Sequence, residues 1–301
     1  MVAAAITTRH ALDDSSSQTA PRDGKVVLIC ADDLLDACRA LGAGVVIRSE
    51  SAAITAAAIA GGGLAADVDG WVTTSAWVEV LASRSPGALA GTEALASSPT
   101  VLATAPGRFQ AVSDLCRPAE VWPCLGGAAG QPWAKLGDGR HPEWRELKVG
   151  LTNPSSAVGL AVLASASAGF FGTRGFTVND ARFADFEGWL ATLAEPSAAG
   201  DEDPAQTLVT RPGTYSAAGT VAARTGRLRA RGVETIAPRP EVAATVVVAR
   251  LAGRDSLPDV DRIRAALLTA GWSPATPADL APTLKPGVMA ALHSLWRSVT
   301  T

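Results

Sequence analysis

The sequence of 301 residues is poor in the residue types on which many catalytic and nucleic-acid-binding sites depend. It contains only 3 His and 1 Tyr, and 18% of its residues are charged. Lys and Arg form no dense run and the formal net charge is −3, which excludes the electrostatic footprint of a nucleic-acid-binding protein. The short basic stretch RTGRLRARG, at 224–232, is interpreted as a solvated loop or helix face. We therefore expect no nucleic-acid partner.

Sequence motifs of the common enzyme classes are also missing. There is no GxxxxGK[ST] phosphate loop, no HExxH, no GxSxG and no glycine-rich dinucleotide fingerprint after the first predicted strand. His141 lies in a polar loop, which is typical of a surface residue rather than a general base. The acidic residues at 32–33 and 201–203 lack the spacing of a calcium loop. The sequence thus predicts a protein that is not an enzyme and that uses no cofactor or metal.

Long apolar runs and an export signal are absent from the sequence as it stands. No segment reaches the roughly 18 to 20 uninterrupted apolar residues that a membrane-crossing helix needs. The first residues lack the basic start and apolar core of a signal peptide. We interpret residues 1–23 as a flexible tail ahead of the first strand.

The four cysteines form two close pairs, Cys30 with Cys38 and Cys116 with Cys124. No CxxC motif or Cys/His cluster indicates zinc, so we predict two local disulfides and a domain outside the cytoplasm. Four reduced, buried thiols in a cytosolic protein are the alternative, and four cysteines allow three connectivities. If the disulfides form, export depends on residues outside this sequence, and we expect a signal or membrane anchor there in the full-length form.

Strand-like and helix-like segments alternate along the chain. Apolar, β-branched segments at 25–30, 45–49 and 241–251 are predicted as strands, and the helical spacing that follows the first two indicates helices. The last fifty residues predict two helices, and the second half of TLVTRPGTYSAAGTVAARTG (207–226) is also predicted to be helical. This alternation predicts an α/β fold with mostly parallel sheets.

Polar residues gather where predicted strands give way to helices. The turn NPSS at 153–156 follows a short apolar segment and precedes an uncharged helix. In a parallel sheet such turns face a common crevice, where free N–H groups of a helix can bind an anion or a polar oxygen. An ordinary helix cap that binds nothing is the alternative. Similar turns after other strands favour a binding site over a lone cap.

These segments resemble a known family. PEWRELKVGLTNPSSAVGLAVLASA is similar to the segment that opens the ligand loop of the second lobe in extracellular solute-binding proteins with the two-lobed, type 2 periplasmic-binding fold. ASSPTVLATA and EVAATVVVARL resemble the two strands that cross between the lobes. The resemblance covers most of 24–299, and the nearest likeness is to actinobacterial exported domains of this fold.

The resemblance implies two α/β lobes that close over a ligand by a hinge motion. Lobe 1 would comprise 24–104 plus 241–301 and lobe 2 would comprise 105–240, with crossing strands near 98–106 and 240–250. The implied ligand contacts are Asp32, Asp33, Thr74, Ser75, Ser97, Ser98, Asn153, Ser155, Ser156, Arg211 and Tyr215. A plain surface or core role for Tyr215 stays open. Two carboxylates would repel a tetrahedral oxyanion, which leaves cationic, sugar-like or peptidic ligands.

We therefore expect an extracytoplasmic monomer that captures a small polar solute and works with a membrane transporter or a membrane-anchored protein. The alternative is an envelope interaction or sensor domain of a larger membrane-associated protein, in which the same fold serves as a scaffold. The eight tryptophans invite a sugar-stacking interpretation, but most are predicted to be core residues. Trp71 and Trp77, which flank the polar turn at 73–75, are the candidates for sugar contact.

Overall fold

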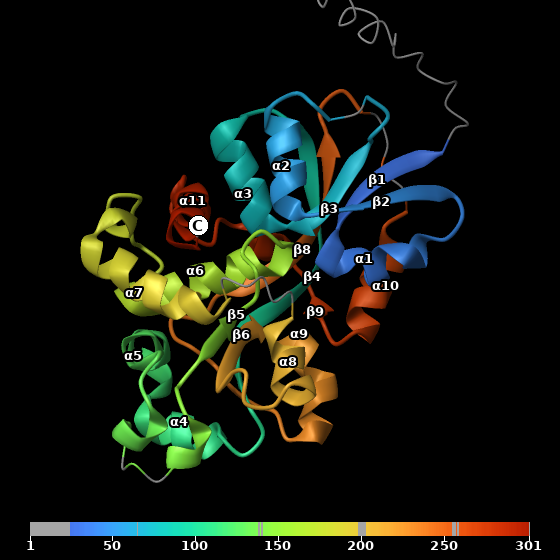
Figure 1. Ribbon diagram of the computed structural model, residues 1–301. Helices are drawn as coiled ribbons and strands as arrows, with labels where there is room; N and C mark the ends of the chain where they lie inside the picture. Colours follow the sequence, from blue (N-terminus) through green and yellow to red (C-terminus); the bar gives the residue numbers. More distant parts are fainter. Residues whose placement is uncertain are drawn as a thin grey trace, which may run out of the picture.

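The chain folds into two sheet-and-helix lobes that share one long strand (Figure 1). A computed structural model describes residues 25–64, 66–137, 139, 141–197, 203–254, 257 and 259–300. The predicted tail, residues 1–23, and part of the acidic segment 201–203 lie outside the described residues. The shared strand is β4 (Leu89–Thr104), whose first part pairs in one sheet and whose last part pairs in the other.

Lobe 1 is built on a sheet with the strand order β2-β1-β3-β8-β4. Its strands besides β4 are β1 (Val26–Ala31), β2 (Val45–Glu50), β3 (Gly70–Thr74), β8 (Ala243–Leu251) and the short β9 (Ser273–Pro274). Strand β1 runs parallel to β2 and β3, whereas β8 runs antiparallel to β3 and β4. Strands β1 and β3 are almost entirely buried, which explains why their sequences are continuously apolar or small.

Lobe 2 is built on the last residues of β4. Thr100–Thr104 pair with β6 (Ala217–Val221), and β7 (Glu234–Ile236) also pairs with β4. Strand β5 (Val149–Leu151) runs parallel to β6. The chain returns to lobe 1 at β8, whose first residue pairs with Pro99. Two adjacent strands therefore connect the lobes, as the sequence predicts.

Helices pack against both sheets. In lobe 1 they are α1 (Leu35–Cys38), α2 (Ala52–Ala60), α3 (Ser75–Arg84) and α10 (Asp261–Thr269). In lobe 2 they are α4 (Phe109–Leu115), α5 (Val121–Ala128), α6 (Ala157–Phe171), α7 (Ala184–Ala194), α8 (Pro204–Thr210) and α9 (Ala222–Thr225). The C-terminal helix α11 (Val288–Thr300) lies beside α3, α6 and α7 (Figure 1). The last helix of the region predicted as part of lobe 1 thus contacts both lobes.

Strand β6 occupies a segment that the sequence analysis predicts as helical. The residues AAGTV are small because α6 and Trp122 lie directly over the strand: a Cβ on Gly219 would lie 2.7 Å from a methyl carbon of Val162 and 2.9 Å from Trp122. Alanine and glycine are typical of helices and loops on propensity alone. Here the close packing of a helix on the sheet determines the composition, so local propensity gives the wrong element.

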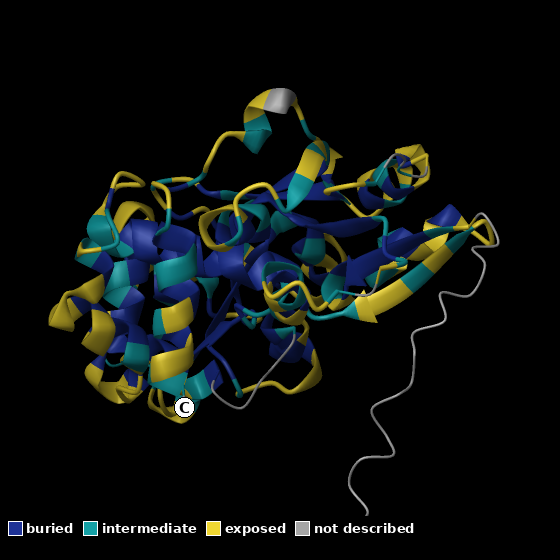
Figure 2. Cartoon of the chain, turned by 90° about the horizontal axis from the view of Figure 1, so that it is seen from above, coloured by how far each residue is buried: buried dark blue, intermediate teal, exposed yellow. Residues whose placement is uncertain are grey.

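The tryptophans are mostly core residues. All of them except Trp144 are less than about one-tenth exposed, and Trp71 and Trp77 are 0% exposed. Figure 2 shows this buried core as dark blue strands and inner helix faces in both lobes. The core interpretation is confirmed for most tryptophans, and the proposed sugar contact at Trp71 and Trp77 is wrong, since neither ring reaches solvent.

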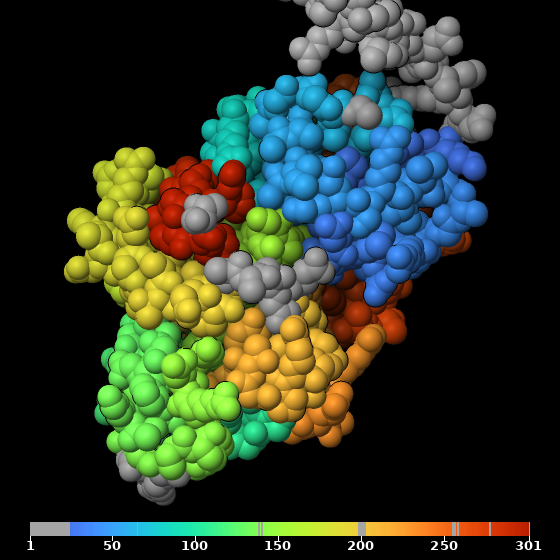
Figure 3. Space-filling view, viewed as in Figure 1, coloured from blue at the N-terminus to red at the C-terminus, as the bar shows by residue number. Residues whose placement is uncertain are grey.

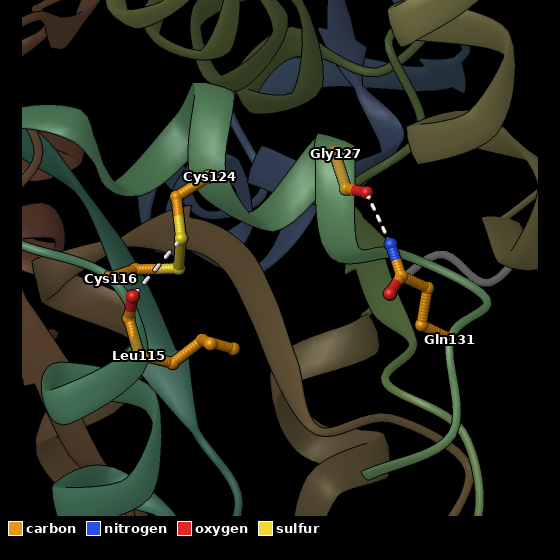
Figure 4. Close-up of a disulfide and its surroundings, with 5 residues drawn as sticks. All are labelled: Leu115, Cys116, Cys124, Gly127 and Gln131. Atoms are coloured by element: carbon orange, nitrogen blue, oxygen red, sulfur yellow. Dashed lines mark hydrogen bonds between the residues drawn. A yellow bond between two sulfur atoms is a disulfide. The ribbon is translucent and has the colours of Figure 1, made fainter. Parts of the chain in front are cut away.

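Both predicted disulfides are present. Cys30, near the end of β1, is bonded to Cys38 in α1, and Cys116, which ends α4, is bonded to Cys124 in α5. Figure 4 shows the second bond, together with the side chain of Gln131, whose Nε2 donates to the carbonyl of Gly127 at the end of α5. Each disulfide links neighbouring elements inside one lobe, and neither crosses between the lobes.

Candidate functional site between the lobes

The ends of four strands meet where the two lobes face each other. Strand β1 is followed by Asp32 and Asp33, and β3 is followed by Ser75 at the start of α3. From lobe 2, β5 is followed by the turn 153–156 and α6, and β6 is followed by α9. This placement is the one expected for the carboxyl ends of strands in an α/β fold.

Helix α6 begins beyond a compact polar turn. The side chain of Ser156 is the N-cap, and its Oγ accepts a hydrogen bond of 3.0 Å from the N–H of Gly159. Asn153 Oδ1 accepts from the N–H of Ser155 at 2.9 Å, which shapes the turn ahead of the cap. The 15-residue helix leaves the N–H groups of its first residues without partners inside the helix, where its dipole favours negative charge.

The carboxylate of Asp33 fills that position. Its Oδ1 accepts from the N–H of Ala157 and its Oδ2 from the N–H of Val158, both at 3.0 Å. Arg224, on α9, donates from Nη2 to the same Oδ2 at 2.9 Å and also donates to the carbonyl of Asp33. The two side chains are 12% and 17% exposed, so this ion pair is largely shielded from water. A carboxylate of lobe 1 therefore occupies the anion position of lobe 2.

The carbonyl groups of the same turn are bonded to lobe 1. Ser51 Oγ and the N–H of Ala53 donate to the carbonyl of Ser155, each at 3.1 Å. Trp77 Nε1 donates to the carbonyl of Ser156, and Thr74 Oγ1 donates to that of Ala157, each at 2.7 Å. Together with Asp33 these bonds hold the start of α6 against lobe 1, and we refer to them as the inter-lobe bridge.

The crossing strands add two further hydroxyl groups. Ser98 Oγ accepts from the N–H of Ala223, at the start of α9, at 3.0 Å. Ser97 Oγ lies 3.4 Å from Thr245 Oγ1 on the neighbouring strand β8. Both serines are buried in the hinge region, and Ser98 connects it to α9, the helix that carries Arg224.

A cavity of about 470 Å³ lies beside the inter-lobe bridge. Lobe 1 contributes Asp32, Asp33 and Asp36 to its lining, and lobe 2 contributes Asp203, Arg224 and Arg227. Figure 3 shows the surfaces that border it, blue for lobe 1 and orange for α8 and α9. The volume falls within the range of small-molecule sites, roughly 300–1,000 Å³. The cavity is thus bordered by both lobes and lined by charged as well as apolar side chains.

Comparisons with known proteins agree with this architecture. No protein-family model and no curated protein matches the sequence. Among solved structures, iron-bound HitA from Pseudomonas aeruginosa is similar over 91% of this chain and 99% of its own, with 14% identity and a TM-score of 0.57. The ferric binding protein from Campylobacter jejuni has 10% identity, a TM-score of 0.57 and coverage of 91% and 96%. AfuA from Actinobacillus pleuropneumoniae, bound to fructose-6-phosphate, has 12% identity, a TM-score of 0.51 and coverage of 92% and 83%.

The chain has the two-lobed fold of the periplasmic binding proteins. The two-lobed α/β fold that the sequence resemblance implies is therefore confirmed, whereas the sheets are mixed rather than mostly parallel, because β8 and β4 run antiparallel to their neighbours. Identities of 10–14% show the fold alone, so ligand and partner have to be argued from the residues of this chain. The nearer likeness to actinobacterial exported domains stays a prediction.

Most of the predicted site residues of this periplasmic-binding fold come together at the junction of the lobes. Asp33, Thr74, Ser155 and Ser156 contribute to the inter-lobe bridge, and Asn153 shapes its turn. Asp32 lines the cavity and accepts a 2.7 Å hydrogen bond from Ser49 Oγ. Ser75 is buried at the first turn of α3, and Ser97 and Ser98 lie in the hinge region.

The structure does not bring Arg211 and Tyr215 to this group. Both precede β6, so they lie at the amino end of a strand whose carboxyl end faces the other lobe. Tyr215 is 4% exposed, and its ring lies over Gly150. Arg211 donates from Nη2 to Thr207 Oγ1 in α8. Tyr215 is a core residue here, which is the alternative that the sequence left open.

Sequence reasoning missed Arg224 and Arg227. Both belong to the basic stretch 224–232, which the sequence analysis interprets as a solvated face. That interpretation is wrong for Arg224, whose guanidinium is paired with Asp33. The signal was the position of Arg224 three residues after a strand, and it was hidden because β6 was predicted as a helix.

The described residues contain no group of three or more His, Cys, Asp or Glu side chains placed to hold a metal ion. Within the same part of the chain, no helix is both long and apolar enough to cross a membrane.

Proposed function

We propose that the protein is an extracytoplasmic solute-binding protein that holds a small polar solute with a cationic group between its lobes. The observation that carries the proposal is the cavity of about 470 Å³, to which both lobes contribute charged side chains. Cavities at the junction of two domains are frequent binding sites for small molecules. Opening and closing of the lobes about β4 and β8 would admit and enclose the solute.

The charges of the cavity favour a cation over an anion. The N-terminus of α6 is the natural anion position, but Asp33 already fills it and is itself paired with Arg224. Of the other charged groups in the lining, Asp32, Asp36 and Asp203 are acidic and Arg227 is basic. An amine or amidine group would be attracted by the surplus of carboxylates, whereas a free oxyanion would be repelled.

The two disulfides support a location outside the cytoplasm, where such bonds persist. The solved structures with this fold include proteins whose descriptions name the periplasm. We propose that the protein acts as a monomer and passes its solute to a membrane transporter or a membrane-anchored partner.

A thermal-shift titration tests the proposal with three four-carbon probes of similar length: putrescine, 1,4-butanediol and succinate. Putrescine should raise the Tm, because a ligand at 100 times its Kd stabilises the folded state by about 2.7 kcal/mol. The double variant Asp32→Asn/Asp36→Asn should lose this shift. Asp185→Asn, an exposed carboxylate on α7, is the matched control and should keep it. A shift with succinate alone would overturn the preference for a cation.

One observation favours a second candidate, an envelope interaction or sensor domain. The start of α6 is bonded to lobe 1 by protein groups alone, so no solute is needed to hold the lobes together. Such a closed body could serve as a rigid scaffold. If no probe in a broader panel of amines, sugars and peptides raises the Tm, and small-angle X-ray scattering shows closed lobes throughout, the scaffold function is favoured.

A further inference from the structure

Lobe 2 contains a second cavity, of about 250 Å³, that shares no lining residue with the cavity between the lobes. It lies at the far end of β4, next to the turn that carries Pro106. Apolar walls come from Leu208 and Val209 of α8 and from the ring of Trp144. The proline–glycine turn at 212–213, between the predicted ligand contacts Arg211 and Tyr215, also lines this cavity.

The cavity is lined by a buried arginine. Arg108 is only 8% exposed, and its Nη1 donates to Ser216 Oγ at 2.7 Å. Its guanidinium carbon lies over the Trp144 ring, 4.9 Å from the ring centre, in a cation–π contact. His141 stacks on the same ring, with 3.8 Å between the ring centres, and braces it from the loop.

The guanidinium of Arg108 has no ion-pair partner among the described residues, and its only hydrogen bond to them is the one to Ser216. Its remaining N–H groups are not among the sealed, unpartnered atoms of those residues, and Arg108 lines the cavity. Burial lowers the pKa of Arg108, and the carboxylate of Glu143 opposes this effect only in part. A buried charge without an ion-pair partner is costly unless a bound group compensates it.

A second arginine stands at the opening of the same cavity. Arg231 is exposed, and its Nη2 donates to the carbonyl of Val209 in the wall at 3.4 Å. Two guanidinium groups therefore contribute to a cavity whose lining includes no acidic side chain. The combination gives a positive end and an apolar body to the space.

We propose that this cavity is a binding site for a small carboxylate attached to an apolar or aromatic body. A planar carboxylate matches the free N–H groups of a guanidinium in a paired geometry. The apolar part would pack against Trp144 and the α8 wall. The volume of about 250 Å³ admits a single ring with its carboxylate rather than a larger ligand.

Isothermal titration calorimetry with benzoate tests the proposal, with benzamide as the uncharged probe of the same shape. Benzoate should bind with one site per chain, and benzamide should bind at least about tenfold more weakly, because a neutral amide lacks the charge-assisted, paired hydrogen bonds of a carboxylate with a guanidinium. The variants Arg108→Met and Arg231→Glu should each weaken benzoate binding at least tenfold.

Two controls separate this site from other effects. Arg229→Glu changes an exposed arginine that lies in the same 3₁₀ helix as Arg231, Gly226–Arg231, but lines neither cavity. Asp32→Asn/Asp36→Asn changes the site between the lobes. Both should bind benzoate as the wild type does. Absence of benzoate binding, equal binding of benzamide, or unchanged binding in Arg231→Glu would overturn the proposal. Because Arg231 is exposed, its substitution should not disturb folding. Benzoate binding by Arg231→Glu therefore tests the proposal even if Arg108→Met does not fold.

Discussion

Asp33 Oδ2 lies 2.9 Å from Arg224 Nη2, although 191 positions separate the two residues in the chain. The pair joins the end of β1 in lobe 1 to the first turn after β6 in lobe 2. The same carboxylate accepts two N–H groups of α6, so one side chain contacts two elements of the opposite lobe. This carboxylate therefore forms more hydrogen bonds across the junction than any other single side chain of the inter-lobe bridge.

Replacing Asp33 with Asn should loosen the lobes. The amide keeps the shape of the side chain but loses its charge and turns an NH₂ group toward one of its former donors. We expect a loss of about 1–3 kcal/mol in the free energy of unfolding, because the lost bonds involve charged groups. Small-angle X-ray scattering should show a larger radius of gyration. If Asp33→Asn matches Asp185→Asn in both measurements, the carboxylate contributes nothing to closure.

Replacing Trp77 with Phe should weaken the inter-lobe bridge at one bond. The variant deletes the Nε1–H that donates to the carbonyl of Ser156 and leaves that oxygen without this donor. Trp71→Phe removes the same atoms from a ring that is equally buried but whose Nε1 has no partner. Chemical denaturation should therefore show that Trp77→Phe loses about 1 kcal/mol more of the free energy of unfolding than Trp71→Phe does. Equal losses would mean that the bond to Ser156 adds no stability.

Gly159 should not tolerate a side chain, although it lies in a helix. A Cβ there would collide with the carbonyl oxygen of Asn153 and lie 2.7 Å from that of Thr152. Gly159→Ala should therefore displace the turn and lower stability. At Gly188, in the exposed part of α7, a Cβ meets nothing within 4 Å, so Gly188→Ala should add up to about 1 kcal/mol. Thermal unfolding of the two variants should give Tm shifts of opposite sign.

The sequence alone predicts the architecture well and the closure poorly. The apolar, β-branched runs of β1, β2 and β8 and the close spacing of the cysteines are local signals, and they identify strands and disulfides correctly. The polar turn before α6 is also a local signal, and its Ser156 is the N-cap of the helix. The bond between Asp33 and α6 depends on how two distant segments approach each other, and no local pattern encodes it.

The errors in the predicted site lie on either side of one strand, β6. The family resemblance implies that Arg211 and Tyr215, before this strand, contact the ligand, and the basic stretch after it is interpreted from the sequence as a solvated face. A strand at Ala217–Val221 reverses both assignments, since only its carboxyl end faces the other lobe. Packing of α6 on Gly219 is a tertiary requirement, which is why propensity could not reveal it.

His293 should make the protein sensitive to acid. Burial, together with Arg84 and Arg297, lowers its pKa from 6.5 to about 4, and both of its ring nitrogens are sealed without partners. The unfolded chain then binds more protons than the folded one between these values, so stability falls as the pH falls from 6.5 to 4. His293→Phe keeps a ring against Trp77. This variant should not show the acid-induced loss in the free energy of unfolding, which is on the order of 3 kcal/mol in the wild type. Urea denaturation at pH 7 and pH 4.5 measures the difference.

Glu79 should have the opposite dependence. Burial raises its pKa from 4.5 to about 7, although it accepts a 3.0 Å hydrogen bond from the N–H of Thr283. Here the folded chain binds more protons than the unfolded one, so stability falls as the pH rises from 4.5 to 7. Glu79→Gln should keep an acceptor for the N–H of Thr283. Its free energy of unfolding, compared with that of the wild type, should be more favourable at pH 7 than at pH 4.5. The same trend in Glu79→Gln and in the wild type would contradict the assignment.

The two disulfides join cysteines that are eight positions apart and consecutive in the chain. Because synthesis proceeds from the N-terminus, Cys38 can meet Cys30 before Cys116 and Cys124 have been synthesised. Cys116 and Cys124 then follow, and no other cysteine lies between the two pairs. The native pairing is therefore also the order of synthesis, and a compartment that supplies an oxidant can produce it without a disulfide isomerase.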